Sequence, residues 1–182
     1  MNPFVFLIES LFDLYIMVVL LRIWLQWARA DFYNPFSQFV VKATQPVVRP
    51  LRRVIPALGP IDTASVLFAL VLMVVKISLL TLIQSGALLP LMPLLLASVF
   101  KLVHDAFQLI FYVVLAGVIM SWIMQGYHPV AAALYQLTEP LLRPIRRILP
   151  TMGGLDFSPM VLLFGLQFLQ YALGYLLSYA FR

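Results

Sequence analysis

Two kinds of side chain are scarce in this 182-residue sequence: it contains no cysteine, and only 10% of its residues are charged. The absence of cysteine excludes disulfide bonds, thiolate catalysis and cysteine-based metal sites. Soluble domains carry about 25% charged residues, so this chain has too few to cover a water-facing surface. Hydrophobic residues make up 63% of the sequence, which predicts an integral membrane protein that forms one small bundle.

Motifs of the common catalytic and nucleotide-binding families are also absent. The sequence contains no G-x-x-x-x-G-K-[ST], no G-x-G-x-x-G and no H-E-x-x-H pattern, and no serine stands in a nucleophile elbow. The two histidines, His104 and His128, are expected on opposite sides of the membrane, so they cannot share a metal ion. We therefore expect no enzyme activity, no cofactor and no metal site.

Four apolar segments are long enough to cross a bilayer, since about 20 mostly apolar residues span its hydrocarbon core. They cover approximately residues 4–27, 64–83, 98–124 and 159–181. Backbone groups in lipid must be satisfied internally, and these segments are too long for barrel strands, so all four are predicted to be helices. The first segment does not resemble a cleavable signal, because no basic residues precede it and it contains Glu9 and Asp13. The predicted fold class is an all-α membrane protein with four transmembrane helices.

One stretch of the sequence occurs twice. Residues 44–62 read TQPVVRPLRRVIPALGPID, and residues 138–156, which lie 94 positions later, read TEPLLRPIRRILPTMGGLD. Nine of the nineteen positions are identical, and each copy lies between two apolar segments. A repeat of this kind indicates two tandem structural units, which we place at residues 1–97 and 98–182. Each unit is expected to be a helical hairpin, and the two hairpins are expected to point the same way, as a parallel repeat.

The basic residues indicate how the chain is oriented. The first loop between apolar segments contains five of them and the third contains three, whereas the second, near residues 84–97, contains none. The positive-inside rule therefore places the first and third loops in the cytoplasm and both termini outside. Arg22 lies near the cytoplasmic end of the first span and Lys101 near the outer end of the third. Both are expected to extend their charged ends to the interface.

Each basic loop is predicted to form two short helices. The asparagine-proline pair at residues 34–35 and the histidine-proline pair at residues 128–129 have the pattern of an N-cap followed by proline at the first helical position. The next proline is expected to end the first helix, while Thr44 or Thr138 caps the second. Each second helix has three arginines spaced i, i+3, i+4, which places them on one face. These are Arg49, Arg52 and Arg53 in the first copy and Arg143, Arg146 and Arg147 in the second.

A short helix with a row of arginines and an apolar remainder is expected to lie at the membrane interface. Three functions remain open for these arginines. They can simply hold the loops in the cytoplasm, they can bind anionic lipid headgroups or a partner, at about 1 kcal/mol per arginine, or they can bind nucleic acid. The nucleic-acid signal is weak, because the positive-inside requirement already raises the net charge of +5.

An aspartate closes each copy of the repeat. Asp62 and Asp156 come shortly before the next spanning segment, and Ser158 with the proline after it has the pattern of a helix cap. The dipole of a helix stabilises a carboxylate near its N-terminus, and both aspartates are within reach of the arginines. We expect Asp62, Asp156 and Ser158 to anchor each loop to the start of the following helix.

Ionisable residues within the spans are further candidates for function. They are Glu9, Asp13, Lys76, His104 and Asp105. At a rise of about 1.5 Å per residue, Asp13 and Lys76 lie at a similar depth in the outer half of consecutive antiparallel helices, which predicts an ion pair. The equivalent positions in the second unit are Gln108 and Gln170, which are expected to face each other and form a hydrogen bond.

We call these seven residues the polar ladder, and two interpretations of it remain open. In the first, the polar groups only hold the helices in register, since such contacts in membranes contribute less than about 2 kcal/mol each. In the second, they form a path for cations or protons in the outer half of the membrane, lined by Glu9, Asp13, His104 and Asp105. Four spans enclose little water, so a transport role would require an oligomer.

The duplicated pattern T-[QE]-P-x-x-R-P-[LI]-R-R-x-[IL]-P, followed by glycine and aspartate, is long and specific. With this pattern, essentially the whole chain resembles the YggT family, also called YlmG, as two tandem units. The second copy keeps the D-x-S-P ending of the family at residues 156–159, whereas the first departs from it with D-T-A-S at residues 62–65. The resemblance implies a small multi-pass protein of the bacterial cytoplasmic (inner) membrane.

The resemblance also implies two kinds of function. Bacterial members are linked to osmotic-stress tolerance and potassium homeostasis, a role that would use the polar ladder in a homo-oligomer and without a cofactor. Other relatives are linked to cell division, nucleoid distribution or cytochrome assembly. A membrane scaffold or assembly factor of that kind would use the arginine helices to bind lipids or other membrane proteins.

Overall fold

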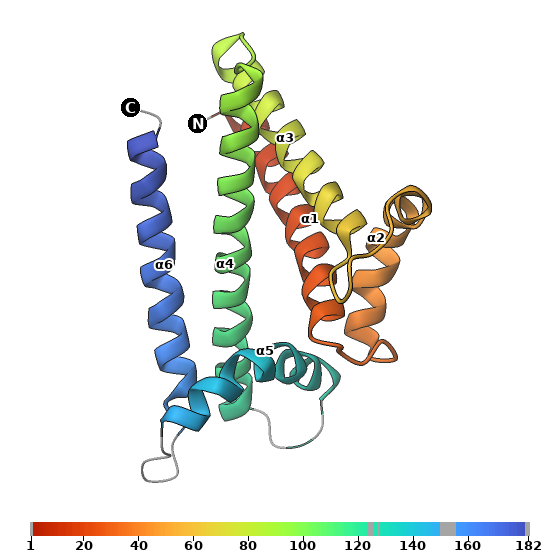
Figure 1. Ribbon diagram of the computed structural model, residues 1–182, viewed down its shortest axis with the longest axis vertical. Coiled ribbons are helices and arrows are strands. Elements are labelled where there is room, and N and C mark those ends of the chain that lie inside the picture. The colour runs from red at the N-terminus through yellow and green to blue at the C-terminus, as the bar shows by residue number, and fades with distance from the viewer. Residues whose placement is uncertain (1, 124–125, 127, 150–155, 181–182) are drawn as a thin grey trace.

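The computed structural model describes residues 2–123, 126, 128–149 and 156–180. Within these ranges the chain is helical and contains no strand beyond one isolated bridge between Leu58 and Ile61. The helices are α1 (Pro3–Trp27), α2 (Pro35–Val54), α3 (Thr63–Ser85), α4 (Leu91–Ile123), α5 (Pro129–Ile148) and α6 (Ser158–Ala180) (Figure 1). Each half therefore consists of a long helix, a 20-residue helix and a second long helix.

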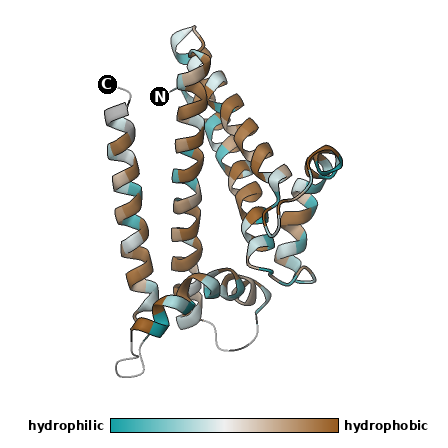
Figure 2. Cartoon of the chain, in the orientation of Figure 1, coloured by the Kyte–Doolittle hydropathy of each residue, from teal (hydrophilic) through white to brown (hydrophobic). Residues whose placement is uncertain are grey.

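Four helices are long and apolar enough to cross a membrane: α1, α3, α4 and the Ser158–Leu176 part of α6. Hydrophobic residues dominate along α1, α3 and α4 in Figure 2, whereas α2 and α5 alternate between polar and apolar. The prediction of an all-α, multi-pass membrane protein is confirmed. The expected ends of the third and fourth spans, at residues 124 and 181, lie outside the described residues.

The helix α4 begins earlier than the sequence predicts. It starts at Leu91, not near residue 98, and is 33 residues long. Pro90 directly precedes the helix, and Pro93 lies in its first turn. A helix needs no N–H donor in its first turn, so proline is tolerated there.

The four spanning helices are not arranged as a closed four-helix bundle. α1 packs against α3, α4 packs against both, and α6 packs against α4 and α5. Both ends of the chain lie at one end of the molecule, which we call the termini end; α2 and α5 lie toward the other, the arginine end (Figure 1). Of the described residues of α6, only Leu166 is a buried hydrophobic, so most of this helix is left to face lipid.

The larger of two hydrophobic clusters among the described residues joins the two halves. Its buried members include Ile16 and Leu25 of α1, Met73 of α3, Val113 of α4 and Leu137 of α5. A smaller cluster packs α2 against α1 and α3, through Val48, Val19 and Phe68. The loops also meet directly, since Asn34 Nδ2 donates to the Pro129 carbonyl at 2.7 Å and the Asp31 N–H donates to Gln136 Oε1 at 2.8 Å.

Each basic loop contains one 20-residue helix, so the prediction of two short helices is wrong. The expected N-caps are present: the Phe36 N–H donates to Asn34 Oδ1 at 2.9 Å, and the Val130 N–H donates to His128 Nδ1 at 3.3 Å. Both helices continue through two prolines, Pro46 and Pro50 in α2 and Pro140 and Pro144 in α5.

The spacing of the prolines explains why these helices continue. Two prolines four residues apart lie on the same face, and all four prolines are exposed. The carbonyl groups left without a donor therefore lie on the open face, where water or headgroups can bond to them. Thr44 and Thr138 are inside the helices and do not cap them, because each hydroxyl donates to a carbonyl one turn earlier.

Candidate functional site

The first candidate site is a group of six ionisable residues in the half of the spans nearer the termini end. We call Glu9, Asp13, Lys76, Lys101, His104 and Asp105 the polar cluster. Lys76 of α3 is at its centre, with a side chain only 3% exposed. Its ammonium group donates to Asp13 Oδ1 of α1, the contact expected from the sequence, and Glu9 Oε1 lies 3.9 Å away.

The remaining members of the polar cluster lie on α4. Asp105, whose side chain is 5% exposed, has Lys101 Nζ at 2.9 Å and His104 Nδ1 at 3.4 Å. Lys101 was expected only to reach toward the interface, yet it pairs with the carboxylate one turn along its own helix. The spacing of four residues between Lys101 and Asp105 is a sequence signal that could have shown this pair.

The expected hydrogen bond between Gln108 and Gln170 is not formed. Gln108 Nε2 instead donates to the Tyr112 hydroxyl one turn along α4, at 3.4 Å. Gln170 Nε2 is buried and has no hydrogen-bond partner among the described residues. Gln170 stands where the first half has Lys76, and a glutamine is shorter than a lysine and carries no charge, so it reaches less far toward a neighbouring helix and is attracted less strongly to a partner there.

The polar cluster does not continue toward the arginine end. Below it, the core shared by α1, α3 and α4 is made of buried apolar side chains, among them Ile16, Met73 and Leu109. Within the described residues, a single chain therefore has packed apolar side chains where a polar passage through the membrane would have to run.

The second candidate site lies at the arginine end, around Asp62, directly before α3. Arg52 donates to both carboxylate oxygens of Asp62, with Nη2 at 2.6 Å from Oδ2 and Nε at 3.1 Å from Oδ1, and the Ser65 hydroxyl also donates to Oδ2. Arg52 Nη2 donates in addition to Gln26 Oε1 of α1 at 2.7 Å. This network ties α1, α2 and α3 together at one carboxylate.

Arg22 of α1 completes this site and contradicts the expectation that it reaches to the interface. It is only 6% exposed. Its Nη1 donates to Thr44 Oγ1 at 2.7 Å and to the Val41 carbonyl at 3.3 Å, and its Nε lies 3.6 Å from Asp62. Because α2 packs back against α1, the guanidinium finds partners within the protein and stays buried.

The equivalent site in the second half uses different charges. Arg146 donates through Nε to Asp156 at 2.7 Å and through Nη1 to Glu139 at 2.6 Å. The Ser158 N–H donates to Asp156 Oδ1 at 2.9 Å. The first half thus pairs one carboxylate with two arginines, whereas the second pairs one arginine with two carboxylates, because Glu139 stands where the first copy has Gln45.

The two aspartates have lowered pKa values for related reasons. Burial alone would raise the pKa of Asp62, but hydrogen bonds from Arg52 and Ser65 and the two nearby positive charges hold it below its ordinary value. For Asp156, a smaller burial effect is outweighed by hydrogen bonds from Ser158 and Arg146, so its pKa is lowered too. Burial would lower the pKa of Arg146, but its two carboxylate partners raise it.

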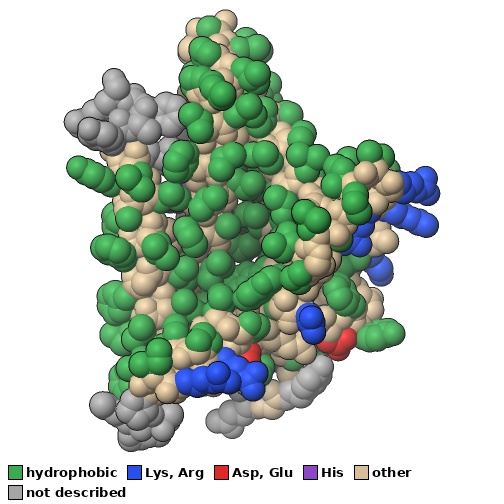
Figure 3. Space-filling view, viewed as in Figure 1, with side chains coloured by type: hydrophobic (Ala, Val, Ile, Leu, Met, Phe, Trp, Pro, Cys, Tyr) green, Lys and Arg blue, Asp and Glu red, His purple; other side chains and the backbone are tan. Residues whose placement is uncertain are grey.

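The arginine triplets therefore divide into two groups. The middle residues, Arg52 and Arg146, are held by the aspartates. The outer residues, Arg49, Arg53, Arg143 and Arg147, are exposed. Figure 3 shows groups of basic side chains over α2 and α5 on an otherwise largely hydrophobic face. Lys42, Arg49 and the two prolines of α2 also line a shallow depression of about 390 Å³.

The described residues contain no group of three histidine, aspartate or glutamate side chains that could hold a metal ion. Both sites are built from charged hydrogen bonds and ion pairs. Such groups can hold or move a proton, attract a cation, or bind a charged headgroup.

The sequence of this chain is similar to a known family and to several known proteins. A family model described as CCB3/YggT matches residues 1–83 and 96–177. The chain is 56% identical over 175 residues to an uncharacterized protein in the proC 3′ region of Vibrio alginolyticus, covering 96% of this chain and 95% of that one. It is also 54% identical over 162 residues to the uncharacterized protein YggT of Escherichia coli K12, covering 89% and 84%. No solved structure matches.

Proposed function

This chain belongs to the CCB3/YggT family, and we propose that it supports osmotic-stress tolerance and ion homeostasis, with potassium as the first ion to test. We place it in the bacterial inner membrane as two tandem parallel hairpins, residues 1–97 and 98–182. The gathering of basic residues on α2 and α5 supports a cytoplasmic position for the arginine end and an outer position for both termini. We expect no enzymatic reaction and no cofactor.

The observation that carries the proposal is the composition of the polar cluster. Three carboxylates, on Glu9, Asp13 and Asp105, face two ammonium groups, on Lys76 and Lys101. Counting each carboxylate as −1 and each ammonium group as +1, and leaving His104 out of the count, the cluster has one negative charge in excess. Charged side chains in spanning helices are costly and are commonly kept for transport or proton transfer. An excess carboxylate in this position would attract a monovalent cation or a proton.

The packed core between the two candidate sites supports an oligomer. Since Ile16, Met73 and Leu109 fill the interior of one chain, a continuous polar route would have to lie between chains. Much of the surface of α6 and of the outer face of α1 is apolar and exposed. We therefore propose that homo-oligomers, or complexes with other membrane proteins, form the functional unit.

The proposal can be tested in cells that lack this protein. We expect wild-type protein to restore growth and potassium content after a rise in external osmolarity. The double variant Asp13→Asn with Lys76→Gln replaces the ion pair by two neutral amides and should insert but fail to restore either. Asp31→Asn, which changes an exposed carboxylate at the arginine end, is the matched control. Full rescue by a correctly inserted double variant would contradict the proposal.

A second function is favoured by a different observation. The exposed arginines of α2 and α5 are free of the aspartate networks, so they can bind anionic lipid headgroups or a partner protein without cost to the fold. In this alternative the protein is a membrane scaffold or assembly factor. Replacing Arg49, Arg53, Arg143 and Arg147 together by glutamine would then abolish rescue, while the Asp13/Lys76 double variant would rescue fully. The same cellular assay therefore separates the two functions.

A further inference from the structure

The shallow depression of about 390 Å³ on α2 brings two cations together. Its lining residues are Lys42, Gln45, Pro46, Arg49 and Pro50, all of them exposed. Lys42, the pair at residues 45–46 and the pair at residues 49–50 follow one another at intervals of about one helical turn, so all five share one side of the helix. A ligand seated here would meet an ammonium group, a guanidinium group and a side-chain amide.

The prolines add backbone acceptors to the same surface. In a helix each carbonyl accepts from the N–H four residues later, and proline has no N–H. Pro46 therefore leaves the Lys42 carbonyl without its backbone donor, and Pro50 does the same to the Pro46 carbonyl. Because residues four apart lie on one face, both carbonyls lie beside the depression. It thus offers cationic donors for an anion and, next to them, neutral acceptors for hydroxyl groups.

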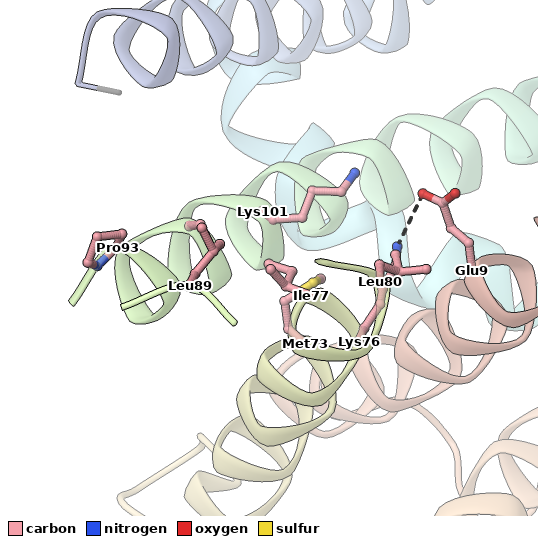
Figure 4. Close-up of a pocket in the computed structure, with 9 residues that line it drawn as sticks. Glu9, Met73, Lys76, Ile77, Leu80, Leu89, Pro93 and Lys101 are labelled. Atoms are coloured by element: carbon pink, nitrogen blue, oxygen red, sulfur yellow. Dashed lines mark ion pairs between the residues drawn. The ribbon is translucent and has the colours of Figure 1, made fainter. Parts of the chain in front are cut away.

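An anion is attracted more strongly to this depression than to the cavity near the termini end. That cavity, of about 420 Å³, contains Lys76 and Lys101 (Figure 4). Both lysines are already paired with carboxylates, Lys76 with Asp13 and Lys101 with Asp105. At the arginine end, the two aspartates that close the repeat are held by the middle arginines of the triplets. The two cations of the depression are exposed and stand outside these networks.

The second half has the prolines but not the charges. Both prolines of α5 stand at the equivalent positions, but an amide replaces the lysine and a carboxylate replaces the glutamine. The depression on α2 therefore has two positive charges, whereas the equivalent surface of α5 has one positive and one negative charge. In the order given above, the equivalents of the five lining residues are Gln136, Glu139, Pro140, Arg143 and Pro144.

Apolar residues at both ends of this face favour a lipid over a soluble anion. Phe39, three residues before Lys42, is 65% exposed, and Val54, four residues after Pro50, is 82% exposed. Large apolar side chains beside cations are typical of a helix that lies at a membrane surface. A soluble anion would leave these side chains in water, whereas the glycerol and acyl parts of a phospholipid can cover them.

We propose that the depression on α2 binds an anionic phospholipid whose headgroup has free hydroxyl groups, as in phosphatidylglycerol. The phosphate contacts Lys42 and Arg49, and the headgroup hydroxyls donate to the carbonyls of Lys42 and Pro46. An anionic lipid without hydroxyls leaves these carbonyls unpaired, and a zwitterionic lipid brings a positive charge toward two cations. The proposal narrows the second function given above, from which it takes the position of α2 at the membrane surface. It does not depend on whether the protein moves ions.

The first experiment compares three lipids. The full-length protein is equilibrated with equal amounts of phosphatidylglycerol, phosphatidylpropanol, which has the same charge but no headgroup hydroxyl, and phosphatidylethanolamine, and the bound lipids are measured by native mass spectrometry. We expect phosphatidylglycerol to be retained about fivefold more than phosphatidylpropanol, the effect of one hydrogen bond, and phosphatidylethanolamine to be retained least. Equal retention of both anionic lipids above phosphatidylethanolamine would overturn this proposal and leave the second function standing. Equal retention of all three would overturn both.

Variants of the prolines assign the hydroxyl preference to α2. Pro46→Ala with Pro50→Ala returns an N–H to each open carbonyl, so phosphatidylglycerol and phosphatidylpropanol should then be retained equally, both above phosphatidylethanolamine. Pro140→Ala with Pro144→Ala makes the same change in α5 and is the matched control, in which the fivefold preference should be kept. Circular dichroism of each variant shows that the helices are kept. A preference that survives in the folded α2 variant would overturn the proposal.

Charge and the choice of a lipid are tested separately. Lys42→Gln with Arg49→Gln should lower the retention of both anionic lipids at least fivefold. Arg29→Gln, which removes an exposed cation outside α2, is the control and should leave retention unchanged. Glycerophosphoglycerol, the soluble headgroup without acyl chains, should not displace phosphatidylglycerol at equal concentration. Unchanged retention in the folded α2 variant, or displacement by the soluble headgroup, would overturn the proposal.

Discussion

At the scale of single residues, the two aspartates that close the repeat differ in their burial and in their number of arginine partners. Asp62 has a side chain 1% exposed and two arginine partners. Asp156 has a side chain 35% exposed and one arginine partner, which Glu139 shares. Loss of one partner from a buried ion pair leaves an uncompensated charge and costs about 3–5 kcal/mol. An exposed pair contributes only about 0–1 kcal/mol.

We therefore expect Asp62→Asn to lower the free energy of unfolding by about 3 kcal/mol or more, and Asp156→Asn by about 1 kcal/mol or less. Unfolding of the purified protein in detergent, followed by circular dichroism, measures both. Equal losses of unfolding free energy in the two variants would show that burial does not make Asp62 more important for stability than Asp156.

The lowered pKa of Asp62 also predicts how this difference varies with pH. In the unfolded chain an aspartate has a pKa of about 3.9. Ionised Asp62 therefore stabilises the fold above that value, and the contribution is lost as the pH falls through the lower folded pKa. The difference in unfolding free energy between wild type and Asp62→Asn should be largest near neutral pH and shrink below about pH 4. A difference that grows with acidity would contradict the sign.

At the scale of helices, the contact between α1 and α2 depends on a pair of residues that has no counterpart in the second half. Thr44 Oγ1 accepts from Arg22, whereas the positions 94 and 95 residues after Arg22 are Ala116 and Gly117. Among the described residues, Thr138, the equivalent of Thr44, has hydrogen bonds to carbonyls of its own helix alone. The two threonines thus form a natural comparison.

Thr44→Val should lower the free energy of unfolding by about 1–3 kcal/mol, because it removes the best partner of a buried guanidinium. Thr138→Val should change it by about 0.5 kcal/mol or less. Thermal or denaturant unfolding of the two variants against wild type measures the difference. Similar losses in both would mean that the helix-internal bonds matter and the contact with Arg22 does not.

A second contact between helices, that of Asp13 on α1 with Lys76 on α3, can be measured by a double-mutant cycle. Asp13→Asn or Lys76→Gln alone leaves a charge in the membrane with a weaker partner, and we expect a loss of about 1–2 kcal/mol for each. The double variant should recover part of that loss, giving a favourable coupling energy. Strictly additive losses in a folded double variant would mean that the pair contributes nothing as a pair.

Several features of the helices can be predicted from the sequence, and others cannot. Length and hydropathy predict the spans, N-cap and proline pairs predict where α2 and α5 begin, and depth predicts that Asp13 meets Lys76. The prolines inside α2 and α5 led to a wrong prediction, because the effect of a proline depends on whether its missing N–H was needed and on which face of the helix is open to solvent. The burial of Arg22 could not be predicted, since it depends on how α2 packs against α1.

The predicted hydrogen bond between Gln108 and Gln170 is wrong for a physical reason. The repeat correctly locates equivalent positions along the chain, but equivalence of position does not guarantee equivalence of contact. Opposite charges attract Asp13 and Lys76 to each other, whereas two neutral amides attract each other only weakly. Sequence periodicity therefore describes the framework of both halves better than it describes their polar contacts.

At the scale of the whole molecule, the two halves share an order of helices but differ in their charges. The first half contains the buried Arg22, Asp62 and Lys76, while α6 of the second half has mostly exposed apolar side chains. The core joins the halves through α1, α3, α4 and α5. We infer that the first half and α4 hold the polar cluster in place, and that α6 is available for contact with lipid or another chain.

The most direct test of the proposed role of the polar cluster is potassium flux into proteoliposomes containing the full-length protein. We expect uptake above that of empty vesicles by wild type and by Asp31→Asn. We expect uptake at least tenfold lower in the Asp13→Asn, Lys76→Gln double variant reconstituted to the same density. Absence of flux in wild type, or unchanged flux in the double variant, would contradict the account.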